Sequence, residues 1–363
     1  MRVSRLHGIR DLRLEDLPRP TPRRGEVLLK VASVGVCGSD VHYYLHGRIG
    51  SQVVTDPIIM GHEFSAWVAG LGDGAEGLEM GQLVTVDPGI SCGACELCQH
   101  GHPNLCPNVR FCGTPPIDGV FAEYTLMPAE NCYPLPEGFG PAEGAILEPL
   151  GIAIHSVDLA HLKAGQTVAV LGAGPIGLLI AAVARAAGAS DILMTEPLPH
   201  RRGFALEYIA DTVLNPDDVD IVAEIMRLTG GRGVDVAFEA AGESDTPQQA
   251  AAVARIGGMV IVTGIPADDT MNLNASTARH RGLTIRAVRR MKHTYPRAIR
   301  LVQTGMVNVK PLASHLFPLE RIDEAFELVA AYDDGVLRAM IQVCLLYTFS
   351  EPTRLKTRSR MPS

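Results

Sequence analysis

Aromatic residues are scarce in this sequence, and positive charge does not dominate it. Phe, Tyr and Trp together make up 5% of the 363 residues, whereas glycine is abundant, with 37 residues. This composition favours an α/β protein with many tight strand-to-helix turns. The formal net charge of −8 argues against a nucleic-acid partner, because the phosphate backbone would be repelled.

The sequence also has little that would direct the chain to a membrane. Its N-terminal stretch is charged and has no apolar core, so we see no secretory signal. Residues 167–184 are uncharged and long enough for a short membrane span, but patterned glycines interrupt them. We therefore expect a cytoplasmic protein without a membrane partner. Its eight cysteines should be thiols or metal ligands rather than disulfides.

The chain changes character near residue 151. Residues 1–150 are rich in Gly, Pro and short apolar runs, such as 27–34, 64–69 and 83–86, which predict short strands and no long helix. Beyond them, strands alternate with helices, which predicts a parallel sheet covered on both faces. The predicted strands span 166–171, 191–196, 234–240 and 259–265, and the predicted helices span 178–187 and 217–228.

The C-terminal part follows neither pattern throughout. Residues 285–343 contain predicted helices at 295–303 and 322–331, and we expect this segment to return to the first domain. Residues 344–363 have four basic residues and no periodicity, which predicts a disordered tail.

A glycine pattern typical of a dinucleotide site follows the strand at 166–171. In Gly172-x-Gly174-x-x-Gly177, the first glycine permits a tight turn and the second lets a pyrophosphate approach the backbone. The third allows close packing of helix and strand. Pro175 stands at the expected first helical position, and free N–H groups at that helix start would face the anion. The alternative is a tight turn that binds no ligand.

An acidic residue at the end of the next strand indicates which dinucleotide binds. Glu196 lies 19 positions after Gly177, where a carboxylate would accept hydrogen bonds from both ribose hydroxyls and repel a 2′-phosphate. This favours NAD. Arg201 and Arg202 follow closely and leave NADP open, because an arginine can hold a 2′-phosphate.

Four clustered cysteines are the most specific motif in the chain. Cys92, Cys95, Cys98 and Cys106 lie within 15 residues and can close a tetrahedral shell around Zn²⁺ with no open position. Such a site is structural. An iron–sulfur cluster is the alternative, but the seven-residue gap before Cys106 and the lack of a second such run disfavour it. The other cysteines without a motif are Cys112, Cys132 and Cys344.

Three further polar motifs stand in the otherwise apolar first part. They are the segments Cys37-Gly38-Ser39-Asp40, Gly61-His62-Glu63 and Leu147-Glu148-Pro149-Leu150. A thiolate, an imidazole and carboxylates can form an open zinc site that keeps a place for water or substrate. Each motif alone is weak, but together with the downstream glycine pattern they indicate a zinc-dependent dehydrogenase.

With these motifs, the sequence resembles the zinc-dependent medium-chain dehydrogenase/reductase family, and within it the sorbitol/xylitol (polyol) dehydrogenases. The resemblance runs from about residue 5 to Val343. The segments that carry it include VGVCGSDVHYYLHGRIG, MGHEFSAWV, ILEPLGIAIH and VLGAGPIG. Plain alcohol dehydrogenases of the family have a cysteine where this chain has Glu148, and the polyol branch has Glu.

The resemblance implies an α/β fold of two domains. Residues 1–150 and 285–343 would form a mostly β, GroES-like catalytic domain, with the zinc lobe at 88–110. Residues 151–284 would form a Rossmann domain with a doubly wound parallel sheet. The implied cofactors are NAD and two zinc ions per chain, the substrate is a small polyol oxidised to a ketose, and the assembly is a homotetramer.

The resemblance also assigns roles to single residues. Cys37, His62 and Glu63 match the catalytic zinc ligands, and Glu148 matches a residue that reaches zinc through water. Ser39 matches the proton-relay hydroxyl, and Tyr43 and Arg290 match substrate contacts. The positions that match cofactor contacts are Ile176, Glu196 and Arg201.

Two positions depart from the family pattern. Met291 replaces a frequent Tyr, which leaves the substrate preference open, and the family more usually has Asp at position 196. The rival functions are a zinc-free quinone reductase, a threonine-type or other secondary-alcohol zinc dehydrogenase, and an inactive nucleotide-binding relative. The intact ligand set disfavours the first and the last.

Overall fold

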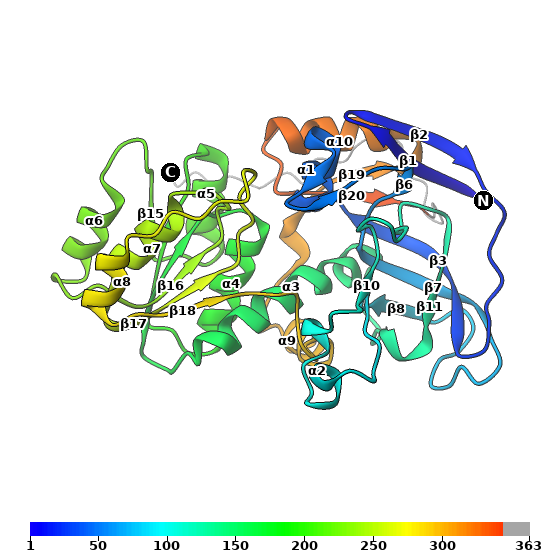
Figure 1. Cartoon of the computed structure of the whole chain (residues 1–363), viewed down its shortest axis with the longest axis horizontal. Coiled ribbons are helices and arrows are strands. Elements are labelled where there is room, and N and C mark those ends of the chain that lie inside the picture. Colours follow the sequence, from blue (N-terminus) through cyan, green and yellow to red (C-terminus); the bar gives the residue numbers. More distant parts are fainter. Residues whose placement is uncertain (344–363) are drawn as a thin grey trace, which may run out of the picture.

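The computed structural model describes residues 1–343, so the predicted tail at 344–363 lies outside the described part. The described chain forms a β-rich part and a parallel α/β part, with helix α3 (Pro141–Ala160) running between them (Figure 1). No helix within residues 1–343 is long and apolar enough to cross a membrane.

A seven-stranded sheet organises the β-rich part. Its order is β12-β8-β7-β3-β20-β19, and β11 pairs with β3. Its strands are β3 (Glu26–Gly35), β7 (Glu63–Leu71), β8 (Leu83–Val86), β11 (Tyr124–Pro128), β12 (Cys132–Pro134), β19 (Ala313–Pro318) and β20 (Arg338–Gln342). The last two strands come from the C-terminal segment, and β20 pairs with β3 of the first part.

Smaller elements complete the β-rich part. A three-stranded sheet has the order β2-β1-β6, and two-stranded ribbons pair β4 with β5 and β9 with β10. These strands are β1 (Arg2–Gly8), β2 (Asp11–Asp16), β6 (Ile58–Ile59), β4 (Arg48–Ile49), β5 (Gln52–Val53), β9 (Gly89–Ile90) and β10 (Arg110–Phe111). The helices are α1 (Gly38–His46), α2 (Glu96–Gln99), α9 (Tyr295–Gln303) and α10 (Ile322–Ala331). Single 3₁₀ turns lie at Pro103–Leu105, Ala129–Asn131, Lys310–Leu312 and Leu319–Arg321.

A six-stranded sheet, all of whose strand pairs are parallel, organises the second part, in the order β15-β14-β13-β16-β17-β18. Its strands are β13 (Thr167–Leu171), β14 (Asp191–Thr195), β15 (Thr212–Leu214), β16 (Val234–Glu239), β17 (Ala254–Val262) and β18 (Thr284–Ala287). Its helices are α4 (Pro175–Ala186), α5 (Pro199–Tyr208), α6 (Ile221–Leu228), α7 (Thr246–Val253) and α8 (Ala275–Arg281). The chain order reverses between β13 and β16, which is the switch point where such sheets bind ligands.

Several expectations on single elements are wrong. Helix α3 begins at Pro141 and has 20 residues, inside the range where no long helix was predicted. It was missed because it is buried on nearly all sides and so shows no amphipathic stripe. Helix α6 begins at Ile221 rather than 217, because the carboxylate of Asp220 caps it by accepting from the Ala223 N–H. The uncharged residues 167–184 form β13 and most of α4, which agrees with the expectation drawn from the glycines that interrupt them.

Candidate active site and metal centres

Three residues of the proposed catalytic site converge from the start of one strand and the start of one helix. Cys37 precedes α1, and His62 and Glu63 lie at the start of β7. Their sulfur, imidazole nitrogen and carboxylate oxygen all lie within 4.8 Å of one another. The antiparallel pairing of β3 and β7 brings these segments together, since Gly35 is opposite Glu63. A thiolate, an imidazole and a carboxylate at this spacing fit one Zn²⁺ ion.

A buried carboxylate supports two of these residues from behind. Asp40, which is 1% exposed, accepts hydrogen bonds from the Cys37 N–H at 3.0 Å and from the Gly61 N–H at 3.1 Å. Its Oδ1 lies 3.7 Å from His62 Nδ1. Burial alone would lower the pKa of His62, but the charges of Asp40 and Cys37 raise it well above its ordinary value. Zinc binding would therefore release a proton from this site.

A buried arginine holds the third residue. Arg338 on β20 contacts the Glu63 carboxylate, and the two side chains are 3% and 1% exposed. The arginine also neutralises charge near Cys37. The carboxylates of Asp40 and Glu63 and the thiolate of Cys37 need compensating positive charge to be buried together. Arg338 supplies part of that charge, and a Zn²⁺ ion would supply the rest.

Glu148 lies beside the triplet rather than within it. It is on α3, 3% exposed, and its carboxyl is not among the three ligand atoms that converge. Burial raises its pKa to about 8, while the charge of His62 opposes this rise. This placement fits a carboxyl group that acts on substrate and water next to the metal.

The residues expected to contact substrate lie around the same site. Ser39 is the second residue of α1, and Tyr43 follows one turn later with its hydroxyl 3.3 Å from Gln52 Oε1. The guanidinium carbon of Arg290 lies 4.2 Å from the centroid of the Phe111 ring. Its Nη1 is buried and has no hydrogen-bond partner among residues 1–343. Burial lowers the pKa of Arg290 to about 10, and neighbouring Glu148, Asp87 and Tyr43 oppose that shift.

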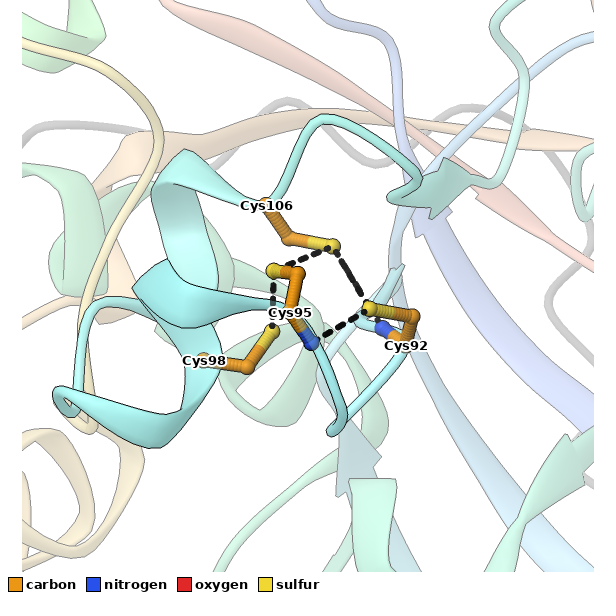
Figure 2. Close-up of side chains that lie close together, drawn as sticks. All are labelled: Cys92, Cys95, Cys98 and Cys106. Atoms are coloured by element: carbon orange, nitrogen blue, oxygen red, sulfur yellow. Dashed lines mark hydrogen bonds between the residues drawn. The ribbon is translucent and has the colours of Figure 1, made fainter.

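The four-cysteine motif folds into a compact lobe. Figure 2 shows the side chains of Cys92, Cys95, Cys98 and Cys106 converging from the loop and from α2. Neighbouring sulfur atoms lie 3.4, 3.5 and 3.8 Å apart. Zn–S bonds of about 2.3 Å in a tetrahedron give sulfur separations of roughly 3.8 Å, so the four thiols fit one zinc ion.

The glycine-rich loop has the shape that a dinucleotide needs. Gly172 has φ of 98°, and a Cβ there would meet the Ala241 nitrogen at 2.8 Å. A Cβ on Gly177 would lie 2.0 Å from the Gly172 carbonyl oxygen, so only glycine allows the helix to pack this closely. At the helix start Gly174, Pro175 and Ile176 are partly exposed, although the flanking residues are buried. Pro175 has no backbone N–H, so the N–H groups of Gly174 and Ile176 and the partly exposed surface of this turn are what it offers to a ligand.

The acidic and basic residues after β14 have distinct environments. Glu196 is buried and accepts from the Ala173 N–H at 2.9 Å and from the Leu198 N–H at 3.1 Å. Through the Ala173 N–H it therefore fixes the glycine-rich loop. Arg202 donates to the carbonyl oxygens of Glu196 and Pro197. Arg201 instead has an unpartnered Nε, lies 4.8 Å from the Tyr332 ring and approaches Gly174.

Sequence reasoning assigned no role to two residues that the structure places at the site. Asp40 is part of the Cys37-Gly38-Ser39-Asp40 motif. Its position three residues after the N-cap Cys37 is the pattern of a capping box, which could have indicated that its carboxylate accepts the Cys37 N–H. Arg338 lies about 275 residues from Glu63 in the chain. The one sequence feature that could have indicated its role is that it is a single charged residue in an otherwise apolar strand.

This arrangement defines a class of protein. This chain combines three ligand residues that leave a metal position open, a closed four-thiolate site and a dinucleotide-binding fold. This combination is typical of a zinc-binding oxidoreductase. The sequence matches two family descriptions, "Alcohol dehydrogenase GroES-like domain" over residues 23–137 and "Zinc-binding dehydrogenase" over residues 175–304. The chain belongs to this zinc-binding alcohol dehydrogenase family, so the predicted family and fold class are confirmed.

Relatives in this family span nearly the whole chain. Sorbitol dehydrogenase of Bacillus subtilis is 37% identical over 341 residues, which covers 94% of this chain and 97% of the relative. D-xylulose reductase A of Aspergillus oryzae is 37% identical over 333 residues, covering 90% and 92%. The structure of 2R,3R-butanediol dehydrogenase from Bacillus subtilis has a TM-score of 0.84 at 31% identity and covers 94% of this chain and 99% of that one.

Proposed function

We propose that this protein oxidises a secondary hydroxyl of a small polyol, such as sorbitol or xylitol, to the ketose and transfers the hydride to NAD. The observation that carries this proposal is the buried set Cys37, His62 and Glu63 with Glu148 beside it. Glutamate rather than cysteine at position 148 leaves a polar group in the pocket. Sorbitol dehydrogenase and D-xylulose reductase, which act on such compounds, are relatives over nine tenths of the chain.

The two cofactors would occupy the sites described above. Cys37, His62 and Glu63 would hold one zinc ion, and the four cysteines of the lobe would hold the other. When bound, zinc acts as a Lewis acid on the alcohol and NAD accepts the hydride. Helix α3 carries Glu148 and leads into β13 of the dinucleotide-binding part, so a carboxyl group on it could act on a substrate held next to the cofactor.

The chain's own groups would bind the polyol and move its proton. The buried donors of Arg290 and the hydroxyl of Tyr43 would bind hydroxyls that do not react. Ser39, half-buried at the start of α1, would pass the hydroxyl proton outward, and Glu148 would orient the reacting carbon. A site built of such groups rejects analogues without hydroxyls far more strongly than an apolar pocket rejects an extra methylene.

We propose NAD rather than NADP as the acceptor. Glu196 is buried at the end of β14, where its negative charge would repel a 2′-phosphate. Arg202 is engaged with backbone carbonyls and so is not free to hold that phosphate. Arg201 remains available and would contact the ribose and pyrophosphate side of the cofactor.

The residue at position 291 supports a second candidate function, the oxidation of a smaller diol. Met291 is buried and offers a thioether where a hydroxyl would help to hold a longer polyol. The structural likeness to 2R,3R-butanediol dehydrogenase fits a smaller diol substrate. A threonine-type activity uses the same zinc chemistry. We expect a shorter polyol to be preferred over sorbitol if Met291 sets the pocket.

A direct assay separates these activities. NADH formation at 340 nm should be measured with xylitol, sorbitol, 2,3-butanediol and threonine, before and after chelation and again after Zn²⁺ is restored. We expect polyol oxidation that chelation abolishes and zinc restores. Faster turnover of threonine than of any polyol would reject the proposal, and so would activity that survives complete metal removal.

For assembly and location we propose a cytoplasmic homotetramer, as the family resemblance implies. The domain division that we propose is residues 1–150 with 285–343, and residues 151–284. Strand β18 straddles the boundary at 285 and pairs with β17 in the parallel sheet. Light scattering of the purified protein tests the assembly, with a mass of four chains expected.

A further inference from the structure

We propose that the four-cysteine lobe, besides being structural, positions the substrate-binding Arg290, and that Asn104 is the residue through which it does so. This inference rests on the proposed function in its assignment of Arg290 to substrate. It adds a specificity role to a segment that otherwise contributes only stability.

Arg290 lies in a segment that needs outside support. Residues 288–294 connect β18 of the parallel sheet to α9, and so cross from one part of the molecule to the other. Arg290 has φ of 55° and His293 has φ of 50°, both in the left-handed region that non-glycine residues adopt only when their surroundings hold them there. A loop with two such residues has no local preference for this shape.

The lobe supplies contacts on both sides of Arg290. Asn104, buried in the lobe between Cys98 and Cys106, donates from Nδ2 to the carbonyl oxygen of Arg289 at 2.9 Å. Lys292 Nζ donates to His102 Nδ1 at 3.2 Å, although this pair is exposed. The contact of Asn104 is the stronger support, because the Asn104 side chain is buried whereas the Lys292–His102 pair is exposed.

The stem of the lobe holds the Arg290 side chain itself. Phe111 belongs to β10, which pairs with β9 and closes the lobe at its base. The Arg290 guanidinium stacks on this ring, and the ring centroid lies 5.3 Å from that of His62. The lobe and the strand that closes it thus make three contacts. Asn104 holds the backbone before Arg290, and Phe111 stacks on the Arg290 side chain and contacts His62, a proposed zinc ligand. The unpartnered Nη1 of Arg290 is left for the substrate.

This geometry predicts a selective effect when the Asn104 contact is lost. The Asn104→Asp variant keeps the shape of the side chain and removes the donor. Arg290 would then lose its fixed position, while the zinc ligands and the dinucleotide site stay intact. The matched control is Asn108→Asp, which introduces the same charge at an exposed residue of the same lobe.

The test combines kinetics with hydrogen exchange on the zinc-loaded full chain. For Asn104→Asp we expect KM for xylitol to rise about 5-fold or more, because one partly buried hydrogen bond to the Arg289 carbonyl is lost. The KM for 2-butanol, kcat and two zinc ions per chain should be retained. Amide exchange in peptides covering 288–294 should accelerate. Asn108→Asp should match the wild type in all five readouts.

The outcomes separate this inference from the proposed function. An equal loss of activity on both alcohols, loss of zinc alone, or unchanged exchange in 288–294 would overturn the positioning role. If Asn104→Asp is too unstable to purify, Asn104→Ala serves in the same assays. A wild-type enzyme that does not prefer xylitol over 2-butanol would instead reject the polyol function, and the exchange experiment would still decide whether the lobe positions the segment.

Discussion

The Asp40→Asn substitution should weaken zinc binding at the catalytic site without touching a ligand. Asp40 Oδ2 accepts from the Cys37 N–H, Oδ1 accepts from the Gly61 N–H, and Oδ1 faces His62. Asparagine has the same shape but only one acceptor oxygen. Its amide nitrogen would therefore point a donor at one of the two N–H groups, and the negative charge beside His62 would be lost.

The size of the effect follows from these contacts. Each hydrogen bond to a charged acceptor contributes about 1.5–3 kcal/mol, and groups that orient metal ligands typically change metal affinity by about 10- to 100-fold. The two estimates agree, because a 10- to 100-fold change is about 1.4–2.7 kcal/mol. We expect a loss of affinity in this range at the catalytic site, with the four-cysteine site unaffected.

Competition with a chromophoric chelator measures the two zinc affinities separately. The matched control is Asp118→Asn, because Asp118 also accepts a backbone N–H, from Ile59 at 2.9 Å, and is not among the ligand residues. Asp118→Asn should bind zinc as the wild type does. Wild-type affinity at the weaker site in Asp40→Asn would refute the role given to this carboxylate, and so would an equal loss at both sites.

The remaining predictions concern single side chains. Cys95→Ser should leave one zinc ion per chain by elemental analysis and lower the thermal unfolding temperature, because structural zinc contributes folding free energy; two retained ions would contradict the four-thiolate site. Glu148→Gln should lower kcat for polyols while zinc content stays near two per chain, and an inert substitution would make the carboxylate merely structural. Asp235 is buried, and although burial would raise its pKa, ion pairs with Arg232 and Arg255 lower it to about 2. Its stabilisation is therefore complete above its ordinary pKa of 3.8 and lost as pH falls toward 2. Asp235→Asn should cost about 1–3 kcal/mol at pH 7, as measured by denaturant unfolding, and a deficit that persists at pH 2 would contradict this.

The features that could be predicted from the sequence are those that depend on residues close together in the chain. The glycine loop at 172–177 and the four cysteines at 92–106 carry their geometry in their spacing, so the turn and the thiol cluster could be foreseen. The helices at 295–303 and 322–331 have the same bounds in the structure, because their apolar stripes are regular. The β3, β7 and β8 strands follow from short apolar runs.

The features that were missed depend on packing between distant segments. Arg338 meets Glu63 only because β20 joins the sheet beside β3. Asn104 meets Arg289 across 185 residues, and no local pattern marks a side chain that reaches a backbone carbonyl so far away. Helix α3 is buried on nearly all sides, so its apolar residues form no single stripe and its periodicity carried no signal. Tertiary contacts, rather than local propensity, decide all three.

The ratio of kcat/KM for xylitol to that for 2-butanol, measured with NAD on the zinc-loaded enzyme, tests the central claim most directly. Both compounds offer a secondary hydroxyl to the same zinc site, so the ratio isolates the polar partners Glu148, Tyr43 and Arg290. A site built to hydrogen-bond hydroxyl groups can discriminate by about 10⁴-fold or more. We predict a ratio of at least about 10², because a partly hydrated pocket recovers some of that energy. A ratio near one would show that the pocket is apolar and would contradict the polyol function.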